Sequence, residues 1–392
     1  MRCYPFCMWI LLAALTPSAL AVDFSLECPN PTTYARPDVV KRWDPTKSAD
    51  FQANCDLVPV PEDQNGCARH IAWVPPETAP RHQDQLMLML PGELQKPYQF
   101  EIIQGTAAYT GYRVLGLSHA QRIHVTDFCA ATGPDVDTCF RGVRDEILYG
   151  NDAANTVLGV DRVDPIDSLV GRTVSALEEL YWDDLDADGV NDWQWDRYLV
   201  NPPDRLVPAP PTPDQLHWDR IIVVGFSIST VDAMLLAQYH SLAGVVYLDG
   251  PEDDSPDLHV FEQPYATPAC VHFGSYHVGR NEAPIINATW DHTGMGLVEY
   301  DADQPWVDWP VGASRVYTYQ AASGSCVSPP HGSMARDGCM PSDATSGLPA
   351  GLGYGRPHLF EPYVYLFCAA GTFDPNTCTA YSDQSRAPGP RL

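Results

Sequence analysis

The stretch from residue 220 to residue 229 constrains the fold more than any other part of the chain. It reads Arg-Ile-Ile-Val-Val-Gly-Phe-Ser-Ile-Ser. The four β-branched residues 221–224 predict a buried strand, because branching at Cβ favours extended backbone and the run is too short for a helix. A glycine turn ends the strand at once, and apolar residues then recur at helical spacing from Val231. This order of strand, sharp turn and helix is typical of proteins with a parallel sheet.

Ser227 lies in that turn, two residues after Gly225, which is the geometry of a nucleophile elbow. Such a turn lifts the serine hydroxyl clear of the sheet, and the helix N-terminus behind it favours developing negative charge. The usual pattern, G-x-S-x-G, ends in glycine, whereas this chain has another small residue, Ser229. The structural alternative is an ordinary strand-to-helix turn in which Ser227 caps the helix.

Further strands and helices alternate along the chain and predict a mostly parallel sheet covered on both faces. We expect additional strands at 69–74, 85–90, 112–117, 243–248, 270–276 and 315–319, and helices at about 100–111, 165–181 and 359–370. The expected fold class is therefore α/β, with one domain over residues 69–392. Residues 22–68 show no clear periodicity, and we expect an irregular arm tethered by disulfides.

The first residues of the chain predict a secretory signal peptide over 1–21. A basic residue, Arg2, precedes a short apolar run, and Ala19-Leu20-Ala21 is a small-x-small cleavage site. We expect a secreted or periplasmic protein. The apolar run is too short to span a bilayer, so no stable membrane anchor is expected.

The cysteines predict a set of disulfides. Two of the twelve, Cys3 and Cys7, belong to the signal, and an even number in the exported remainder favours pairing. No C-x-x-C motif occurs, so neither a zinc site nor a redox pair is expected. Short separations suggest the pairs Cys55–Cys67, Cys129–Cys139, Cys326–Cys339 and Cys368–Cys378, which leaves Cys28–Cys270.

The net charge of −27 arises from 23 basic and 50 acidic residues. A surface of this sign repels nucleic acid and anionic membranes, so neither is an expected partner.

Four segments in sequence order carry a resemblance to a known family. They are Leu88–Gly92, the helix with Ala107 and Ala108, the stretch 111–117 that contains the next strand, and the elbow at Ser227. Together they resemble the α/β-hydrolase fold, and most of all the exported bacterial esterases and lipases. The resemblance covers roughly residues 69–370. It implies an eight-stranded core sheet, a Ser–acid–His triad in that chain order and an oxyanion hole of two backbone N–H groups.

The implied nucleophile is Ser227, and the implied base is a histidine beyond the last strand. We prefer His331, which follows that strand in a loop, to His358, which opens the closing helix. The acid is expected after the strand 270–276, where Glu282 fits best. Asp249 and Asp253, after the preceding strand, are the alternatives.

Two further expectations concern how this site is organised. The N–H groups of Ile228 and Glu93 are expected to form the oxyanion hole, where the charge appears only in the transition state. Cys326 and Cys339 flank His331, so a disulfide between them would hold the base in place.

A separate acidic motif predicts a structural calcium site. Carboxylates at alternate positions before a glycine converge on a hard cation in extracellular calcium loops. Counted from Asp184, the twelfth position of the motif is Trp195, where an EF-hand has a glutamate, so the motif is not a complete EF-hand. A solvated acidic turn is the alternative. The expected ligands are Asp184, Asp186, Asp188, Val190 and Asp192.

The expected function is a secreted serine hydrolase that cleaves carboxylic esters, with a small-molecule, lipid or polymer ester as substrate and no catalytic cofactor. The segment 251–269 is a candidate lid, in which Leu258, Val260, Phe261 and Tyr265 would contact an acyl chain. Two alternatives stay open. One is a non-catalytic binding or structural protein on the same fold, and the other is a peptidase.

Overall fold

The chain is described by a computed structural model. The described residues are 38–44, 68–76, 84–93, 95–119, 124–132, 135–150, 163–188, 192–201, 211–251, 258–277, 282–295, 299–301, 316–319, 363, 366–367, 370–371, 373–374 and 379–380.

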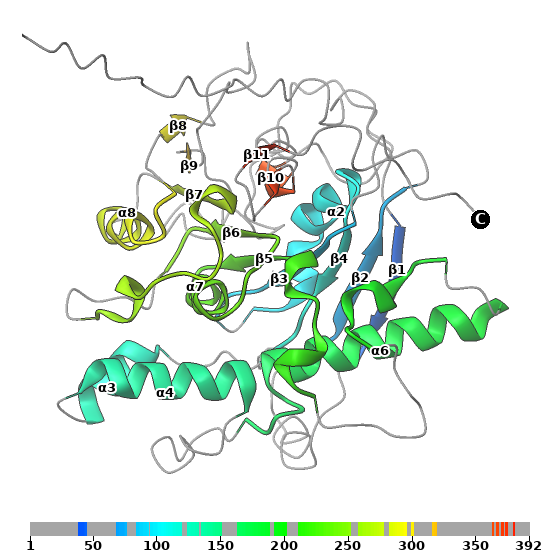
Figure 1. Cartoon of the computed structure of the whole chain (residues 1–392), viewed down its shortest axis with the longest axis horizontal. Coiled ribbons are helices and arrows are strands. Elements are labelled where there is room, and N and C mark those ends of the chain that lie inside the picture. The colour runs from blue at the N-terminus through cyan, green and yellow to red at the C-terminus, as the bar shows by residue number, and fades with distance from the viewer. Residues whose placement is uncertain are drawn as a thin grey trace, which may run out of the picture.

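A nine-stranded sheet forms the centre of the molecule (Figure 1). Its strand order is β1-β2-β4-β3-β5-β6-β7-β9-β8. The pairs β1–β2 and β2–β4 are antiparallel, and every other neighbouring pair is parallel. The strands are β1 Asp38–Trp43, β2 His70–Val74, β3 Leu86–Leu90, β4 Arg113–Gly116, β5 Ile221–Phe226, β6 Gly244–Leu248, β7 His272–His277, β8 Glu299–Asp301 and β9 Val316–Tyr319. This mostly parallel sheet between helices is the α/β-hydrolase fold expected from the sequence, with nine strands where the resemblance implied eight.

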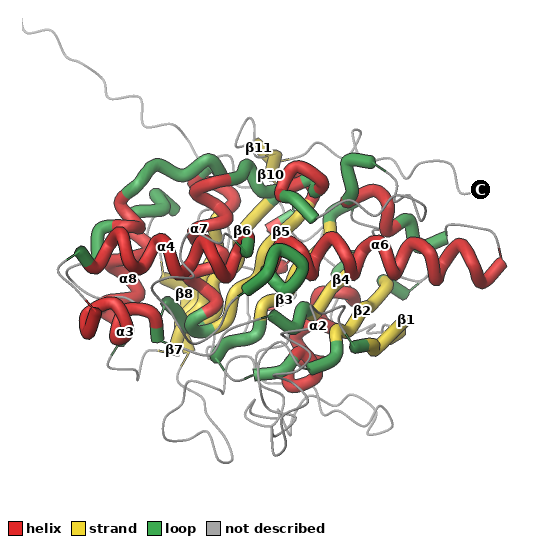
Figure 2. The backbone as a smooth tube through the Cα atoms, turned by 90° about the horizontal axis from the view of Figure 1, so that it is seen from below, coloured by secondary structure: helices red, strands yellow, loops and turns green. Residues whose placement is uncertain are grey.

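Helices cover both faces of the sheet (Figures 1 and 2). The helices are α2 Glu101–Tyr109, α3 Val125–Thr132, α4 Val136–Tyr149, α6 Leu169–Asp188, α7 Ser229–Tyr239 and α8 Ala283–Asp291. Short 3-10 turns occupy Pro97–Phe100, Trp195–Tyr198, Pro213–Gln215, Trp218–Arg220, Val260–Glu262 and Ala269–Val271, and β10 Phe373–Asp374 pairs with β11 Thr379–Ala380.

The sheet has an apolar core on each side. Along β5, Ile221 and Val223 join a cluster that includes residues of α4, α6 and α7. Their neighbours Ile222 and Val224 join a second cluster, which includes residues of α2. Because successive strand residues point to opposite faces, the uninterrupted apolar run in the sequence matches a strand buried on both sides.

The N-terminal arm contains a strand that the sequence analysis missed. Residues 38–43 form β1, so the expectation of an irregular arm is wrong there. The register of β1 on β2 shifts between Val39 and Lys41, which breaks the alternation that would have revealed the strand. Lys41 also forms ion pairs with Glu179 and Asp183 of α6.

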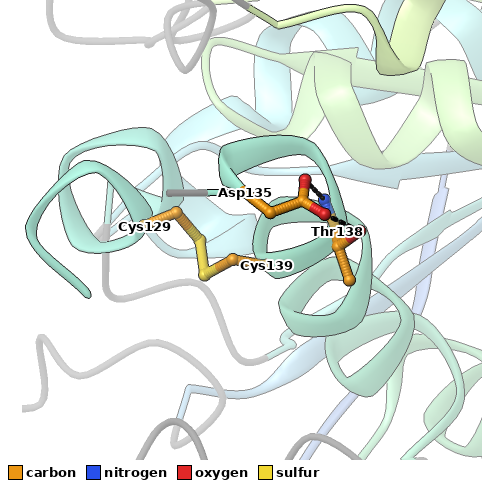
Figure 3. Close-up of a disulfide and its surroundings, with 4 residues drawn as sticks. All are labelled: Cys129, Asp135, Thr138 and Cys139. Carbon is orange, nitrogen blue, oxygen red and sulfur yellow. Dashed lines mark hydrogen bonds between the residues drawn. A yellow bond between two sulfur atoms is a disulfide. The ribbon is translucent and has the colours of Figure 1, made fainter. Parts of the chain in front are cut away.

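The insertion after β4 folds into two helices, α3 and α4, joined by the predicted disulfide Cys129–Cys139 (Figure 3). The Asp135 carboxylate caps α4 by accepting the Thr138 N–H at 3.1 Å. Cys270 is disulfide-bonded as well. Its expected partner Cys28, and the other expected pairs, lie outside the described residues.

The candidate lid is a core segment where the structure describes it. Leu258, Val260 and Phe261 are buried and belong to the cluster beneath α4 and α7. The Phe261 ring lies 6.1 Å from that of Phe140, and the Val260 carbonyl accepts a hydrogen bond from Gln238 at 3.0 Å. These three side chains contribute to the core, and their contact with an acyl chain stays a prediction. Among the described helices, none is long and apolar enough to cross a membrane.

Candidate active site

The loops that follow β3, β5 and β6 meet at the carboxyl edge of the sheet, where parallel α/β sheets bind ligands. Leu90 pairs with Gly225 at the end of β3 and β5, and Phe226 pairs with Leu248 at the end of β5 and β6. This register places the turn at Gly92, the elbow at Ser227 and the loop at Asp249 beside one another.

Ser227 occupies a strained turn between β5 and α7. Its φ of 59° lies in the left-handed region, which non-glycine residues rarely adopt. Its N–H donates to the Leu248 carbonyl at 2.8 Å, so the turn is fixed on the next strand. Ser227 is 2% exposed. The strained strand-to-helix geometry is that of the predicted elbow.

Gly92 brings the loop after β3 against the elbow. A Cβ on Gly92 would lie 2.8 Å from the Cβ of Ser227, which is closer than side chains pack. The N–H of Gly92 donates to Gln95 Oε1 at 3.1 Å. The carboxylate of Glu93, the next residue, pairs with His124 Nε2 at 2.9 Å, where α3 begins.

Ile228, the other expected oxyanion residue, directly precedes α7. It is buried, with helical φ and ψ of −60° and −31°. The Ser227 carbonyl accepts the N–H of Thr230 at 3.0 Å, which closes the first turn behind the elbow. The structure thus brings three of the expected site residues, Glu93, Ser227 and Ile228, onto adjoining loops.

Two of the candidate acids lie at the same edge of the sheet. Asp249 directly follows β6, is fully buried and accepts the His277 N–H on Oδ1 at 3.0 Å. Burial and then the charge of Asp249 raise the pKa of Tyr363 above its ordinary value. Glu282 is partly buried and precedes α8. His331, His358, Asp253, Cys326 and Cys339 lie outside the described residues.

A buried polar group behind the elbow was not found from the sequence. His119 Nε2 lies 3.2 Å from Ser229 Oγ and 3.8 Å from Asp232 Oδ2, and Arg144 Nη1 donates to Asp232 Oδ1 at 3.2 Å. Burial lowers the pKa of His119 to about 4, and the charges of Arg172 and Arg144 act in the same direction. The sequence did contain a signal for this group, because His119 lies three residues beyond the end of β4 and the ends of strands carry site residues in this fold.

The expected calcium ligands are only partly described. Residues 184–188 continue α6, which extends past the expected end at Tyr181. Asp184 is buried and accepts the Trp193 N–H on Oδ2 at 2.8 Å. Positions two apart on an α-helix lie about 200° apart around its axis, so the helical backbone of residues 184–188 is not that of a calcium loop. Within the described residues, no three potential ligands gather in a metal-binding group. The calcium site stays a prediction.

A scan against protein-family models finds no match for this chain, and a search of curated proteins finds none. Several solved structures are similar in backbone. TT1662 from Thermus thermophilus is 12% identical with a TM-score of 0.29, over 73% of this chain and 89% of that one. MGS-M1, an α/β-hydrolase enzyme from a deep-sea metagenome library of the Medee basin, is 12% identical with a TM-score of 0.29, over 75% and 86%. The AtxE2 isopeptidase is 13% identical with a TM-score of 0.31, over 74% and 38%. The fold assignment rests on the strand order and not on these similarities.

Proposed function

We propose that this chain is a secreted serine hydrolase that cleaves carboxylic esters. The observation that supports the proposal best is the left-handed backbone of Ser227 between β5 and α7, with Gly92 packed against its side chain. Strain at a non-glycine residue persists only where the surrounding structure enforces it, and such residues cluster at active sites. An elbow of this kind presents a serine hydroxyl for nucleophilic attack.

In the proposed mechanism, Ser227 Oγ attacks the ester carbonyl carbon while His331 takes the hydroxyl proton. The resulting oxyanion accepts hydrogen bonds from the N–H groups of Glu93 and Ile228. The intermediate collapses, the C–O bond to the alcohol breaks, and the histidine returns its proton to the departing alcohol. Water then releases the acid from the acyl-enzyme by the same steps. Glu282, with Asp249 and Asp253 as the alternatives, orients the histidine.

The proposed substrate is a small-molecule, lipid or polymer ester. Two alternatives remain, a peptidase and a non-catalytic protein on the same fold. The non-catalytic alternative is supported by Ser229 at the usual glycine position and by the low exposure of Ser227.

The deciding experiment combines a fluorophosphonate probe with ester turnover. We expect the probe to label Ser227, and p-nitrophenyl ester hydrolysis to disappear in Ser227→Ala. The matched control is Ser168→Ala, a buried serine whose hydroxyl donates within the turn before α6. That variant should keep both activities. A folded wild type that neither labels nor hydrolyses esters would favour the non-catalytic alternative, whereas cleavage of amides in preference to esters would favour the peptidase.

A further inference from the structure

Ser229 connects the elbow to the loop after β3. It is the first residue of α7, it is fully buried, and its hydroxyl donates a short hydrogen bond to the carbonyl oxygen of Pro91. The two residues are 138 positions apart in the sequence. The hydroxyl therefore does something that a glycine at this position could not do.

The hydrogen bond to Pro91 fixes a peptide plane beside the candidate oxyanion hole. The Pro91 carbonyl and the Gly92 N–H belong to one planar group, so holding the oxygen also sets the direction of the N–H. The Gly92 N–H donates in turn to Gln95 Oε1 at 3.1 Å, so this plane is held at both of its polar atoms. The next plane carries the Glu93 N–H, and its Gly92 carbonyl accepts the Gln95 N–H at 3.2 Å.

Ser229 is itself held by the loop after β4. His119 Nε2 lies 3.2 Å from Ser229 Oγ. The hydroxyl has one hydrogen, and because Pro91 O takes it, we assign Nε2 of His119 as the donor to Ser229. The neighbouring residue Ser118 donates its N–H to His70 Nδ1 at 3.0 Å and accepts from Arg172 Nη1 at 3.1 Å on its carbonyl. Contacts from β2 and α6 thereby fix the histidine that holds the serine.

We propose that Ser229 is a positioning residue, which sets the Pro91–Glu93 turn against Ser227 so that the Glu93 N–H meets the developing oxyanion. This inference rests on the proposed hydrolase function and deepens it. Preorganised donors act mainly in the transition state. Loosening the turn should therefore lower kcat far more than it changes KM.

The test compares two variants that each remove one buried hydroxyl bound to a backbone carbonyl. Ser229→Ala removes the bond to Pro91, and Thr173→Val removes the Thr173 bond to Leu169 O inside α6. For Ser229→Ala we expect kcat on a p-nitrophenyl ester to fall by about 10-fold or more, with KM within about 2-fold, because small misplacements of reacting groups cost large factors in rate. Thr173→Val should leave both constants near the wild-type values.

Hydrogen–deuterium exchange of the peptide covering residues 91–100 provides a readout that does not depend on catalysis. Ser229→Ala should speed exchange in this peptide and leave β5 and β6 unchanged. Unchanged exchange in the turn would overturn the proposal, and so would faster exchange with full kcat. An equal loss of kcat in Thr173→Val would also overturn it, since the effect would then be one of general stability. A wild type that neither hydrolyses esters nor labels at Ser227 would overturn the proposed function instead, and the exchange result alone would then decide whether Ser229 holds the turn.

Discussion

At the scale of single residues, the candidate site depends on how closely backbone segments approach one another. Gly92 packs so closely against the Cβ of Ser227 that no side chain fits between them. Ser227 has a left-handed backbone conformation that residues other than glycine rarely adopt. Asp249 has a φ of 52°, so the loop after β6 is similarly constrained. Changes at these positions should affect reactivity before they affect the fold, because the strain is local to the loops.

Gly92→Ala should abolish most of the reactivity of Ser227. The added methyl group would lie 2.8 Å from the Ser227 Cβ and 3.2 Å from the Phe226 carbonyl, so the turn has to move away from the elbow. We expect the rate of fluorophosphonate labelling to fall by about 10-fold or more. Gly142→Ala in α4 is the matched control, because its Cβ would meet nothing within 4 Å. It should label normally and gain about 0.5–1 kcal/mol in the free energy of unfolding. Equal labelling rates in the two variants would contradict this prediction.

The identity of the acid can be tested by two amide substitutions. Glu282→Gln and Asp249→Asn each remove a charge, and the asparagine keeps an oxygen that can accept the His277 N–H. The variant at the true acid should lose about 100-fold or more in kcat, since the carboxylate holds the histidine and stabilises its charged form. The variant at the other position should retain most of the activity. A small effect in both variants would mean that neither residue is the acid.

At the scale of elements, the face carrying α4, α6 and α7 is held together by covalent and polar links as well as apolar packing. The Cys129–Cys139 disulfide joins α3 to α4, and the fully buried Arg144–Asp232 pair joins α4 to α7. A buried ion pair fixes the relative position of two helices, because breaking it leaves a charge without its partner in the core.

The disulfide should contribute stability by restricting the unfolded chain. Cys129→Ser/Cys139→Ser opens a loop with a sequence separation of 10 residues. We expect a loss of about 2–3 kcal/mol in the free energy of unfolding, measured by urea titration. Reduction of the wild-type protein also breaks the disulfide of Cys270, so the double variant is the cleaner comparison. An unchanged urea midpoint would show that the disulfide contributes nothing.

Calcium should act at the C-terminal end of α6. Calcium that binds the folded chain stabilises it and should raise Tm. A calcium loop also requires residues 184–188 to leave the helix, so the helical circular dichroism signal should decrease slightly. Magnesium at equal ionic strength is the control. Asp184→Asn keeps an oxygen for the Trp193 N–H but removes a ligand charge, and should weaken the calcium effect selectively. Identical melting curves in calcium, magnesium and excess chelator would count against the site.

At the scale of the whole molecule, the buried His119 and the half-buried His240 make stability depend on pH. Burial lowers the pKa of His119 and of His240 to about 4, below the ordinary value of 6.5. Between these pH values the unfolded chain binds protons that the folded chain does not. The free energy of unfolding should therefore fall as the pH decreases from about 6.5 to about 4. The lowered pKa of His119 alone accounts for a loss of about 3 kcal/mol over this range.

Urea titrations at several pH values can measure this dependence. His119→Gln should flatten the decrease between pH 6.5 and 4, because glutamine has no proton to gain. Ser168→Ala, which removes a buried hydroxyl but no titratable group, is the control and should retain the wild-type slope. If the free energy of unfolding changed with pH in the same way in the wild type and in His119→Gln, the lowered pKa of His119 would be contradicted.

The sequence by itself determined the elements whose signal is local. Apolar runs predicted β3, β5 and β6, a glycine before Ser227 predicted the elbow, and short spacing predicted Cys129–Cys139. Only the tertiary structure revealed β1, whose shifted register hides its period, and the link from His119 through Ser229 to Pro91. Those contacts join positions 110 and 138 residues apart. A hydrogen bond between such positions leaves no periodic trace in the sequence, because its geometry exists only after the strands have aligned.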